Sequence, residues 1–150
     1  SNLRLINQTT VSSSVSSINI ENVFSADFDI YQIIANGFST ASTTATEVYL
    51  RYINAGGSVL NDDYDFASWY QSPDVASGIL YIFNPFNSSA YTYNTGQQSS
   101  HYSNPRYLST IGVGRLKQTN TITGFQFVFG QSPVSSGTIR TYGLRIDWWI

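Results

Sequence analysis

His101, the single histidine in 150 residues, is the side chain that could act either as a general base in catalysis or as a metal ligand. A serine-histidine-aspartate triad would have to be built on it, because no other histidine can act as the base. Its surroundings, Gln98–Asn104, are polar and contain no nucleophile elbow of the G-x-S-x-G type. One histidine also cannot supply a histidine-based metal cluster. The context therefore predicts a surface histidine in a polar loop.

Carboxylates gather in one short segment, Asn61–Asp65, which contains three aspartates. Their oxygens are the ligands that calcium prefers. The segment lacks the glycine and the distal glutamate of an EF-hand loop, and aspartates are also common in turns of β-proteins. Both alternatives, a calcium site and a plain turn, stay open.

No other pattern in the chain indicates catalysis. Asp27 and Asp29 could contribute to an acid pair for glycoside hydrolysis, but no spacing singles out such a pair. Gly112-Val113-Gly114 is a lone G-x-G without a following helix, so it does not predict a phosphate loop. The sequence therefore predicts a protein that is not an enzyme, has no cofactor and has no assigned metal ligands.

Tyrosines form a second group with chemical potential, between residues 81 and 107. An exposed tyrosine beside Asn, Gln and Ser can stack on a sugar ring and hydrogen-bond its hydroxyls. The candidate glycan-binding residues are Tyr91, Tyr93 and Tyr102. The alternative is that about half of the tyrosines in this segment line the protein core.

Composition narrows the classes of protein further. Charged residues make up 11% of the chain, well below the quarter that is usual, and the net charge is −2. A nucleic-acid binder would need clustered Lys and Arg, and the basic residues here are scattered. There is no cysteine, and no apolar run reaches the length of a membrane-spanning helix. We therefore expect neither nucleic acid nor a membrane as a partner.

Short apolar runs separated by Gly, Pro, Asn and Ser predict an all-β fold. The length suits one domain, residues 1–150. The expected architecture is a mainly antiparallel, two-sheet sandwich of the jelly-roll kind, with a closed barrel as the alternative. The expected strands are Leu3–Gln8, Val15–Ile20, Asp27–Ala35, Thr46–Asn54, Gly78–Asn84, Tyr107–Leu116, Thr121–Gly130 and Gly137–Ile150, with weaker ones at Asp65–Gln71 and Ala90–Tyr93.

Several of these strands have apolar residues on both faces. In Thr46–Asn54, alternation puts Val48, Leu50 and Tyr52 on one face, and Tyr49 and Ile53 with Arg51 on the other. Two adjacent tryptophans near the C-terminus cannot both point into one core. The second needs a covering loop or a partner chain. We expect a partner chain, such as a further copy of the protein, with these candidate interface residues: Trp149, Tyr49 and Ile53.

Three sequence segments, taken in their order along the chain, resemble a known family. The first runs from Val11 to Ile20 and leads into Phe24–Tyr31, the second is Ile79–Thr92 with its Asn84-Pro85 turn, and the third joins Ile122–Phe127 to Ser136–Leu144. Together they resemble small virion structural proteins of tailed bacteriophages, especially marine cyanophages. The similarity covers about Val11 to Leu144.

The resemblance implies a jelly-roll-like sandwich on the particle surface and supplies no catalytic residues. It implies a capsid decoration (cement) protein, whose partners are the major capsid protein or other virion proteins and further copies of itself. The alternative is a tail-fibre or spike module that binds host surface glycans. No heptads appear, which favours a stand-alone decoration protein over a fibre with a coiled-coil shaft.

Overall fold

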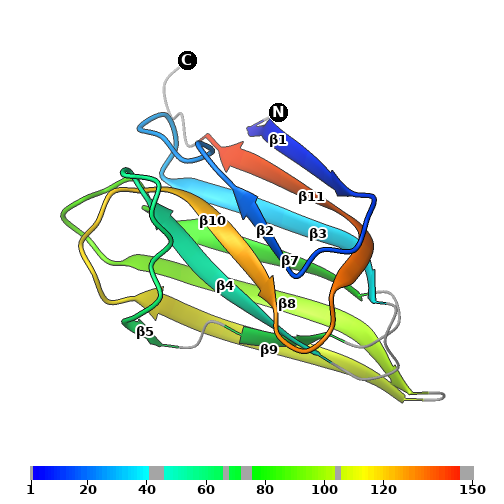
Figure 1. The fold of residues 1–150 in the computed structure, drawn as a ribbon. Helices are drawn as coiled ribbons and strands as arrows, with labels where there is room; N and C mark the ends of the chain where they lie inside the picture. Colours follow the sequence, from blue (N-terminus) through cyan, green and yellow to red (C-terminus); the bar gives the residue numbers. More distant parts are fainter. Residues whose placement is uncertain (1, 41–45, 66–67, 72–75, 104–105, 146–150) are drawn as a thin grey trace.

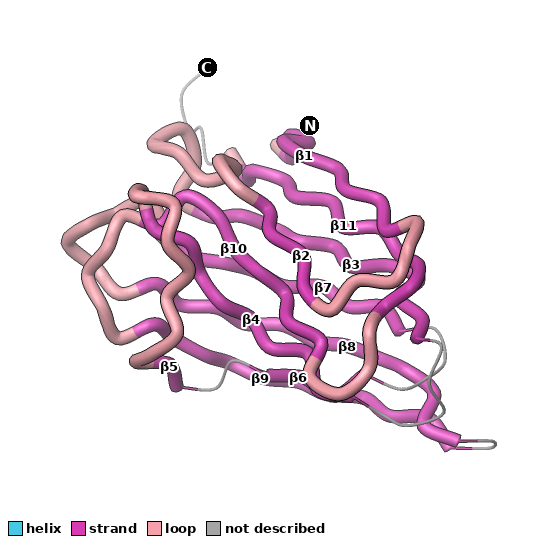
Figure 2. Tube along the Cα trace, in the orientation of Figure 1, coloured by secondary structure: helices cyan, strands magenta, loops and turns pink. Residues whose placement is uncertain are grey.

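The computed structural model describes residues 2–40, 46–65, 68–71, 76–103 and 106–145, and gives the backbone alone at 46, 68–71, 101–103 and 106–108. The described chain is built from strands and loops (Figures 1 and 2), and it contains no helix that could cross a membrane. The strands are β1 Leu3–Val11, β2 Ser17–Ile20, β3 Ile30–Thr40, β4 Thr46–Asn54, β5 Tyr64–Asp65, β6 Ser68–Gln71, β7 Ala76–Phe83, β8 Thr92–Ser103, β9 Arg106–Leu116, β10 Ile122–Phe129 and β11 Val134–Leu144.

Two antiparallel sheets face each other. The larger has the order β1-β11-β3-β7-β8-β9-β5 and the smaller has the order β2-β10-β4-β6. The four strands β1-β11-β3-β7 opposite β2-β10-β4-β6 form the two Greek keys of a jelly roll. The β8–β9 hairpin, with β5 at its end, widens the larger sheet (Figure 1). The predicted jelly-roll sandwich is confirmed.

The closed-barrel alternative does not fit this arrangement. Val15, just before β2 of the smaller sheet, forms an isolated β-bridge with Val134 on β11 of the larger sheet. In the described residues, this is the one β-bridge between the two sheets. The sheets otherwise meet through side chains. The molecule is therefore a sandwich.

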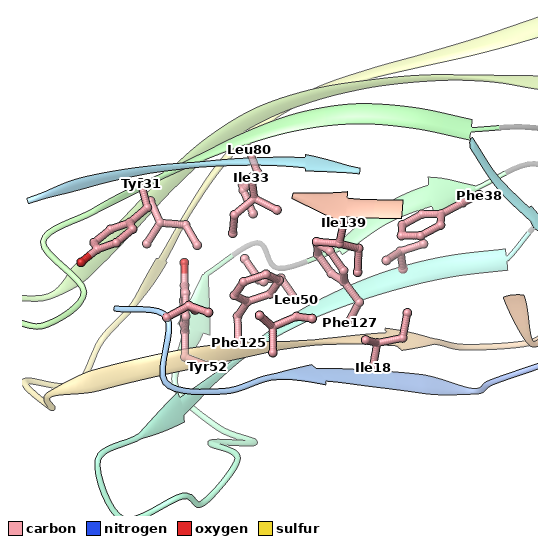
Figure 3. Close-up of a cluster of buried hydrophobic side chains, with 14 of the residues drawn as sticks. Ile18, Tyr31, Ile33, Phe38, Leu50, Tyr52, Leu80, Phe125, Phe127 and Ile139 are labelled. Carbon is pink, nitrogen blue, oxygen red and sulfur yellow. The ribbon is translucent and has the colours of Figure 1, made fainter. Parts of the chain in front are cut away.

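Apolar side chains from both sheets fill the space between them (Figure 3). From β3 the larger sheet contributes Tyr31 and Ile33, and from β10 the smaller sheet contributes Phe125 and Phe127, all fully buried. Phe38 packs edge-on against Phe127, with ring centroids 6.4 Å apart. Strands whose alternate residues are large and apolar thus have one face committed to the core.

A buried polar contact also joins the sheets. Asn94 on β8 donates a hydrogen bond from Nδ2 to the Tyr52 hydroxyl on β4, at 3.0 Å. The Tyr64 hydroxyl accepts from the Tyr52 amide at 2.8 Å and donates to the Leu60 carbonyl at 2.7 Å. Burial raises the pKa of Tyr52, and it raises the pKa of Tyr64 to about 12. These bonds fix β5 and β8 relative to the smaller sheet.

The loop after β4, with the sequence Asn-Ala-Gly-Gly-Ser, forms a hairpin turn. Gly57 donates its amide to the Asn54 carbonyl at 2.9 Å, and the Ser58 amide donates to Asn54 Oδ1 at 3.0 Å. Gly57 has a φ of 82°, which glycine adopts without steric cost. The turn brings Val59 back beside Ile53.

Besides shifts of a few residues at other strand ends, two differences from the sequence prediction are notable. A polar loop was expected around His101, but the backbone continues as a strand, β8, from Thr92 to Ser103. Its residues lack apolar alternation, so pairing with β7 and β9 on both sides, rather than side-chain pattern, builds it. The last strand was expected to run over 137–150. It spans Val134–Leu144, and residues 146–150 lie outside the described chain.

Candidate interface: the outer face of the seven-stranded sheet

Side chains of the larger sheet alternate between the core and the side that faces away from the smaller sheet, here called the outer face. On β3, Tyr31 and Ile33 are buried, whereas Gln32 and Ile34 point outward and are half-buried. Directly paired residues of antiparallel strands share a face, so the register of the ladder identifies the other outward residues.

The register arranges the outer face in rows across the strands from β1 to β9. One row is Leu3, Leu144, Ile30, Phe83, Tyr93 and Arg115; the next is Leu5, Tyr142, Gln32, Tyr81, Thr95 and Val113; the third is Gln8, Arg140, Ile34, Ile79, Gln97 and Ile111. Most positions are apolar or aromatic. An antiparallel sheet with one solvated face normally has polar residues there.

Exposure on this face is greatest along β9. Ile111 is 81% exposed and Val113 is 69% exposed, and Leu3 and Leu5 are exposed at the opposite edge on β1. Of the large apolar residues that the structure describes as exposed, only Phe86 and Tyr91 lie outside the larger sheet, in the loop between β7 and β8. Exposed apolar surface is therefore concentrated on one face of the sandwich, which is typical of a contact surface.

Polar groups on the outer face largely satisfy one another. Gln32 donates from Nε2 to the Tyr81 hydroxyl at 2.8 Å, and Arg140 donates from Nε to Gln8 Oε1 at 3.1 Å. A partner can cover a polar group at lower cost when it already has a hydrogen-bond partner within the chain. These contacts reduce the cost of removing the face from water.

The charged corner of the face is an ion-pair cluster around Asp65. Arg115 Nε lies 2.7 Å from Asp65 Oδ2, and Lys117 Nζ lies 3.1 Å from Asp65 Oδ1. Hydrogen bonds from Arg115 and Lys117 hold the pKa of Asp65 below its usual value. Nearby, Asp63 Oδ2 accepts from Gln118 Nε2 at 2.6 Å. Asp65 thus has basic partners and Asp63 an amide partner, and the described residues contain no group of three or more His, Cys, Asp or Glu side chains that could hold a metal ion.

The outer face of the smaller sheet is different in character. Gln126 donates from Nε2 to Asn19 Oδ1 at 2.8 Å across β10 and β2. Tyr49, an expected interface residue, lies on this face half-buried; its hydroxyl donates to Glu47, and the Arg51 guanidinium sits 5.4 Å from its ring centroid. Tyr49 thus contacts two charged side chains, and its neighbour across the ladder on β10 is Val128.

The other two expected interface residues do not contribute to an exposed patch. Ile53 was expected at an interface with a partner chain, but it is only 1% exposed and so is not available to a partner. The hairpin after β4 returns Val59 beside it, so the same chain supplies its cover. Trp149 lies outside the described residues. The most exposed apolar residues that the structure describes lie instead on the other sheet.

The tyrosines expected to bind glycans are not gathered at one place. Tyr91, in the loop before β8, is 38% exposed, and Tyr93, near the start of β8, is 46% exposed. Tyr102 lies nine residues further along the same strand, about 30 Å away at 3.3 Å per residue. Tyr93 borders a shallow depression that Asp65, Val113 and Arg115 also line. Any sugar site would therefore involve Tyr93 without Tyr102.

In comparisons with known proteins, the chain matches no protein-family model and no curated protein.

Proposed function

We propose that this chain is a non-enzymatic structural protein of a bacteriophage virion: a capsid decoration (cement) protein on the particle surface. In this role it packs its outer face against the major capsid protein or another virion protein and reinforces the shell. The observation that carries the proposal is the apolar outer face, on which hydrogen bonds within the chain already engage several of the polar groups. The three segments that resemble phage structural proteins, and the jelly-roll fold, which is common in viral capsids, support it.

The size of the face approaches that of a standard contact. Six strands at a spacing of about 4.8 Å, and three rows repeating every ~6.8 Å, give a planar area of roughly 590 Å². A standard protein interface buries about 800 Å² on each partner. Burial of apolar surface contributes about 25 cal/mol per Å² before the costs of association. Repeated over a shell, such contacts add resistance to heat and pressure.

The test compares particles with and without this protein. We expect particles that lack it to lose their genome or disassemble at a lower temperature, and purified protein added back to restore the original temperature. Equal resistance of both kinds of particle, or the absence of the protein from capsid heads, would contradict the proposal.

A second candidate function is a tail-fibre or spike module that binds host surface glycans. The observation in its favour is the exposed ring of Tyr93 beside Arg115 and Asp65, since a sugar can stack on the ring and bond to the charged groups. A glycan array tests it. Adhesion is supported if a glycan binds saturably, if Tyr93→Ala abolishes that binding and if Tyr102→Ala leaves it intact. The absence of binding to any glycan counts against adhesion.

A further inference from the structure

One asparagine in the sequence is followed by glycine, Asn36-Gly37, and this pair lies in β3. The ladder between β3 and β7 shifts register between Ala35 and Phe38, so Asn36 and Gly37 together face the single residue Ser77. Two residues opposite one form a β-bulge. Gly37 has a φ of 72°, which glycine adopts without steric cost. The bulge places the pair beside Ser77.

The Ser77 hydroxyl contacts both residues of the pair. Ser77 Oγ accepts a hydrogen bond from the Gly37 amide at 3.2 Å and donates one to Asn36 Oδ1 at 2.8 Å. One oxygen atom thus joins the backbone nitrogen that follows Asn36 to the carbonyl of the Asn36 side chain. These are the two groups that combine when an asparagine closes on its own backbone into a five-membered succinimide ring.

The surroundings leave the pair accessible for this reaction. The Asn36 side chain is exposed, so ammonia can leave it and water can reach it. The space beside Gly37 is open, since a Cβ added there would meet no atom within 4 Å apart from its chain neighbours. Glycine also lacks the side chain that hinders attack by this nitrogen in other sequences.

We propose that Asn36 is a site of self-modification, at which the folded chain converts this asparagine through a succinimide to aspartate or isoaspartate, with Ser77 as the proton relay. The Gly37 nitrogen attacks Asn36 Cγ and forms a new bond to it. The proton of this nitrogen passes to Ser77 Oγ, and the Ser77 hydroxyl proton passes to Asn36 Oδ1. Ser77 is therefore unchanged at the end of the step.

Loss of ammonia then closes the ring. In the tetrahedral intermediate, Asn36 Cγ carries a hydroxyl group and the original Nδ2 amine. The hydroxyl proton moves to Nδ2, the bond between Cγ and Nδ2 breaks, and the carbonyl forms again. The succinimide and one molecule of ammonia are the products, and no oxidation or reduction takes place.

Water, the one co-reactant, opens the ring at either of its two carbonyls. Attack at Cγ breaks the bond to the Gly37 nitrogen, returns a proton to that nitrogen and leaves an aspartate at position 36. Attack at the backbone carbonyl of residue 36 leaves isoaspartate, in which the backbone of β3 is longer by one methylene. Both products carry a carboxylate where the asparagine was neutral.

The new carboxylate changes the outer face of the larger sheet. Asn36 lines a groove on this face together with Ile34, Ile79 and Ile111, and all the residues that line the groove are uncharged. A carboxylate there would have to lose water when a partner covers the groove, which is costly without an opposite charge. This consequence for docking rests on the proposed function, whereas the conversion itself does not.

The first experiment incubates the folded full chain at neutral pH and physiological temperature and follows residue 36 by peptide mapping with mass spectrometry. An isoaspartate-specific methyltransferase measures the isoaspartate that forms. We expect Asn36 to convert in the natural chain and Ser77→Ala to slow this conversion about 10-fold, because the relay is lost. Circular dichroism checks that the variant is folded.

Two variants serve as controls. Ser77→Thr keeps the hydroxyl and suits a strand, so it should convert at a rate close to that of the natural chain. Ser99, on β8, is paired directly with Ser77. Ser99→Ala therefore makes the same chemical change in the next strand, and we expect it to leave the rate at Asn36 unchanged.

The second experiment needs no variant. The relay exists only in the folded bulge, so the natural chain should convert Asn36 faster when folded than when unfolded in urea at the same pH and temperature. In urea, the natural chain and Ser77→Ala should convert at equal rates.

An Asn36 that stays unchanged in the folded chain overturns the inference. A folded Ser77→Ala that converts as fast as the natural chain, or faster, also overturns it, because the two hydrogen bonds would then be neutral or protective. Slower conversion in the folded chain than in urea, or cleavage of the chain after Asn36 in place of conversion, has the same effect. All these rates are measured on the free chain, so this inference and the proposed function fail separately.

Discussion

Replacing Val113 by serine should separate folding from assembly. Val113 lies on the outer face and is 69% exposed. Full burial of a valine side chain is worth about 1.5 to 3 kcal/mol, so the buried third contributes about 0.5 to 1 kcal/mol to folding. We expect Val113→Ser to lower the melting temperature by only about 2 to 4 °C.

The exposed two thirds of Val113 become buried when a partner covers the outer face. Loss of that contact should cost about 1 to 2 kcal/mol per copy, which corresponds to roughly 5- to 30-fold weaker binding. In the assay, purified chain is titrated onto capsids that lack the protein. The measured quantity is the fraction of capsid sites that the chain occupies.

Val128→Ser is the matched control, because it makes the same chemical change on the outer side of β10, in the smaller sheet. We expect it to leave occupancy unchanged. Equal occupancy for Val113→Ser and the natural chain, at saturating and limiting concentrations, would refute the assignment of the contact to the seven-stranded sheet. A loss of binding with Val128→Ser alone would move the contact to the other sheet.

Further predictions concern the scaffold. Gly124→Ala should destabilise the fold by about 1 to 3 kcal/mol in urea unfolding, since the added Cβ would overlap the Ile20 carbonyl on the paired strand β2; an unchanged midpoint would contradict this close approach. Tyr52→Phe should cost about 1 to 3 kcal/mol, because Asn94 Nδ2 is left without its buried acceptor; thermal melting measures the loss, and a gain in stability would contradict it. The free energy of unfolding should also fall above about pH 10. Tyr64 ionises near pH 10 in the unfolded chain, whereas its pKa in the folded chain is about 12. The stabilisation is therefore fully present below pH 10 and is lost as the pH rises to about 12. Tyr64→Phe should flatten this decline by up to about 2 kcal/mol in unfolding free energy measured against pH, and an equally steep decline would contradict it.

The fold class was predictable because several strands have a clear alternation of large apolar residues. β4 is the clearest case: its predicted bounds match those observed, and Val48, Leu50 and Tyr52 are buried as the alternation requires. The hairpin that follows β4 was predictable from its asparagine and glycines. In such segments the side chains alone specify strand, face and turn.

The strand β8 was not predictable in the same way. Its inward positions include Thr92, Asn94 and Ser100, all buried, so no apolar pattern marks its core face. What makes it a strand is hydrogen bonding to β7 on one side and β9 on the other. Pairing between distant segments is not visible in a local window of sequence.

The apolar outer face of the larger sheet could be anticipated only in part. Apolar residues on both faces of single strands indicated that more cover was needed than one sandwich provides. The rows on the outer face, however, combine residues from six strands, and only the register shows that Val113 and Ile79 share a surface. Ile53 was misassigned because the returning hairpin that covers it is a tertiary feature.

The most direct test of the account is footprinting of the chain on intact particles, with side-chain oxidation read by mass spectrometry. We predict that Tyr81, Tyr93 and Ile111, on the seven-stranded sheet, lose reactivity on the particle, whereas Tyr49, on the four-stranded sheet, keeps the reactivity it has in the free chain. Protection of Tyr49 with unchanged reactivity along β7, β8 and β9 would contradict the account.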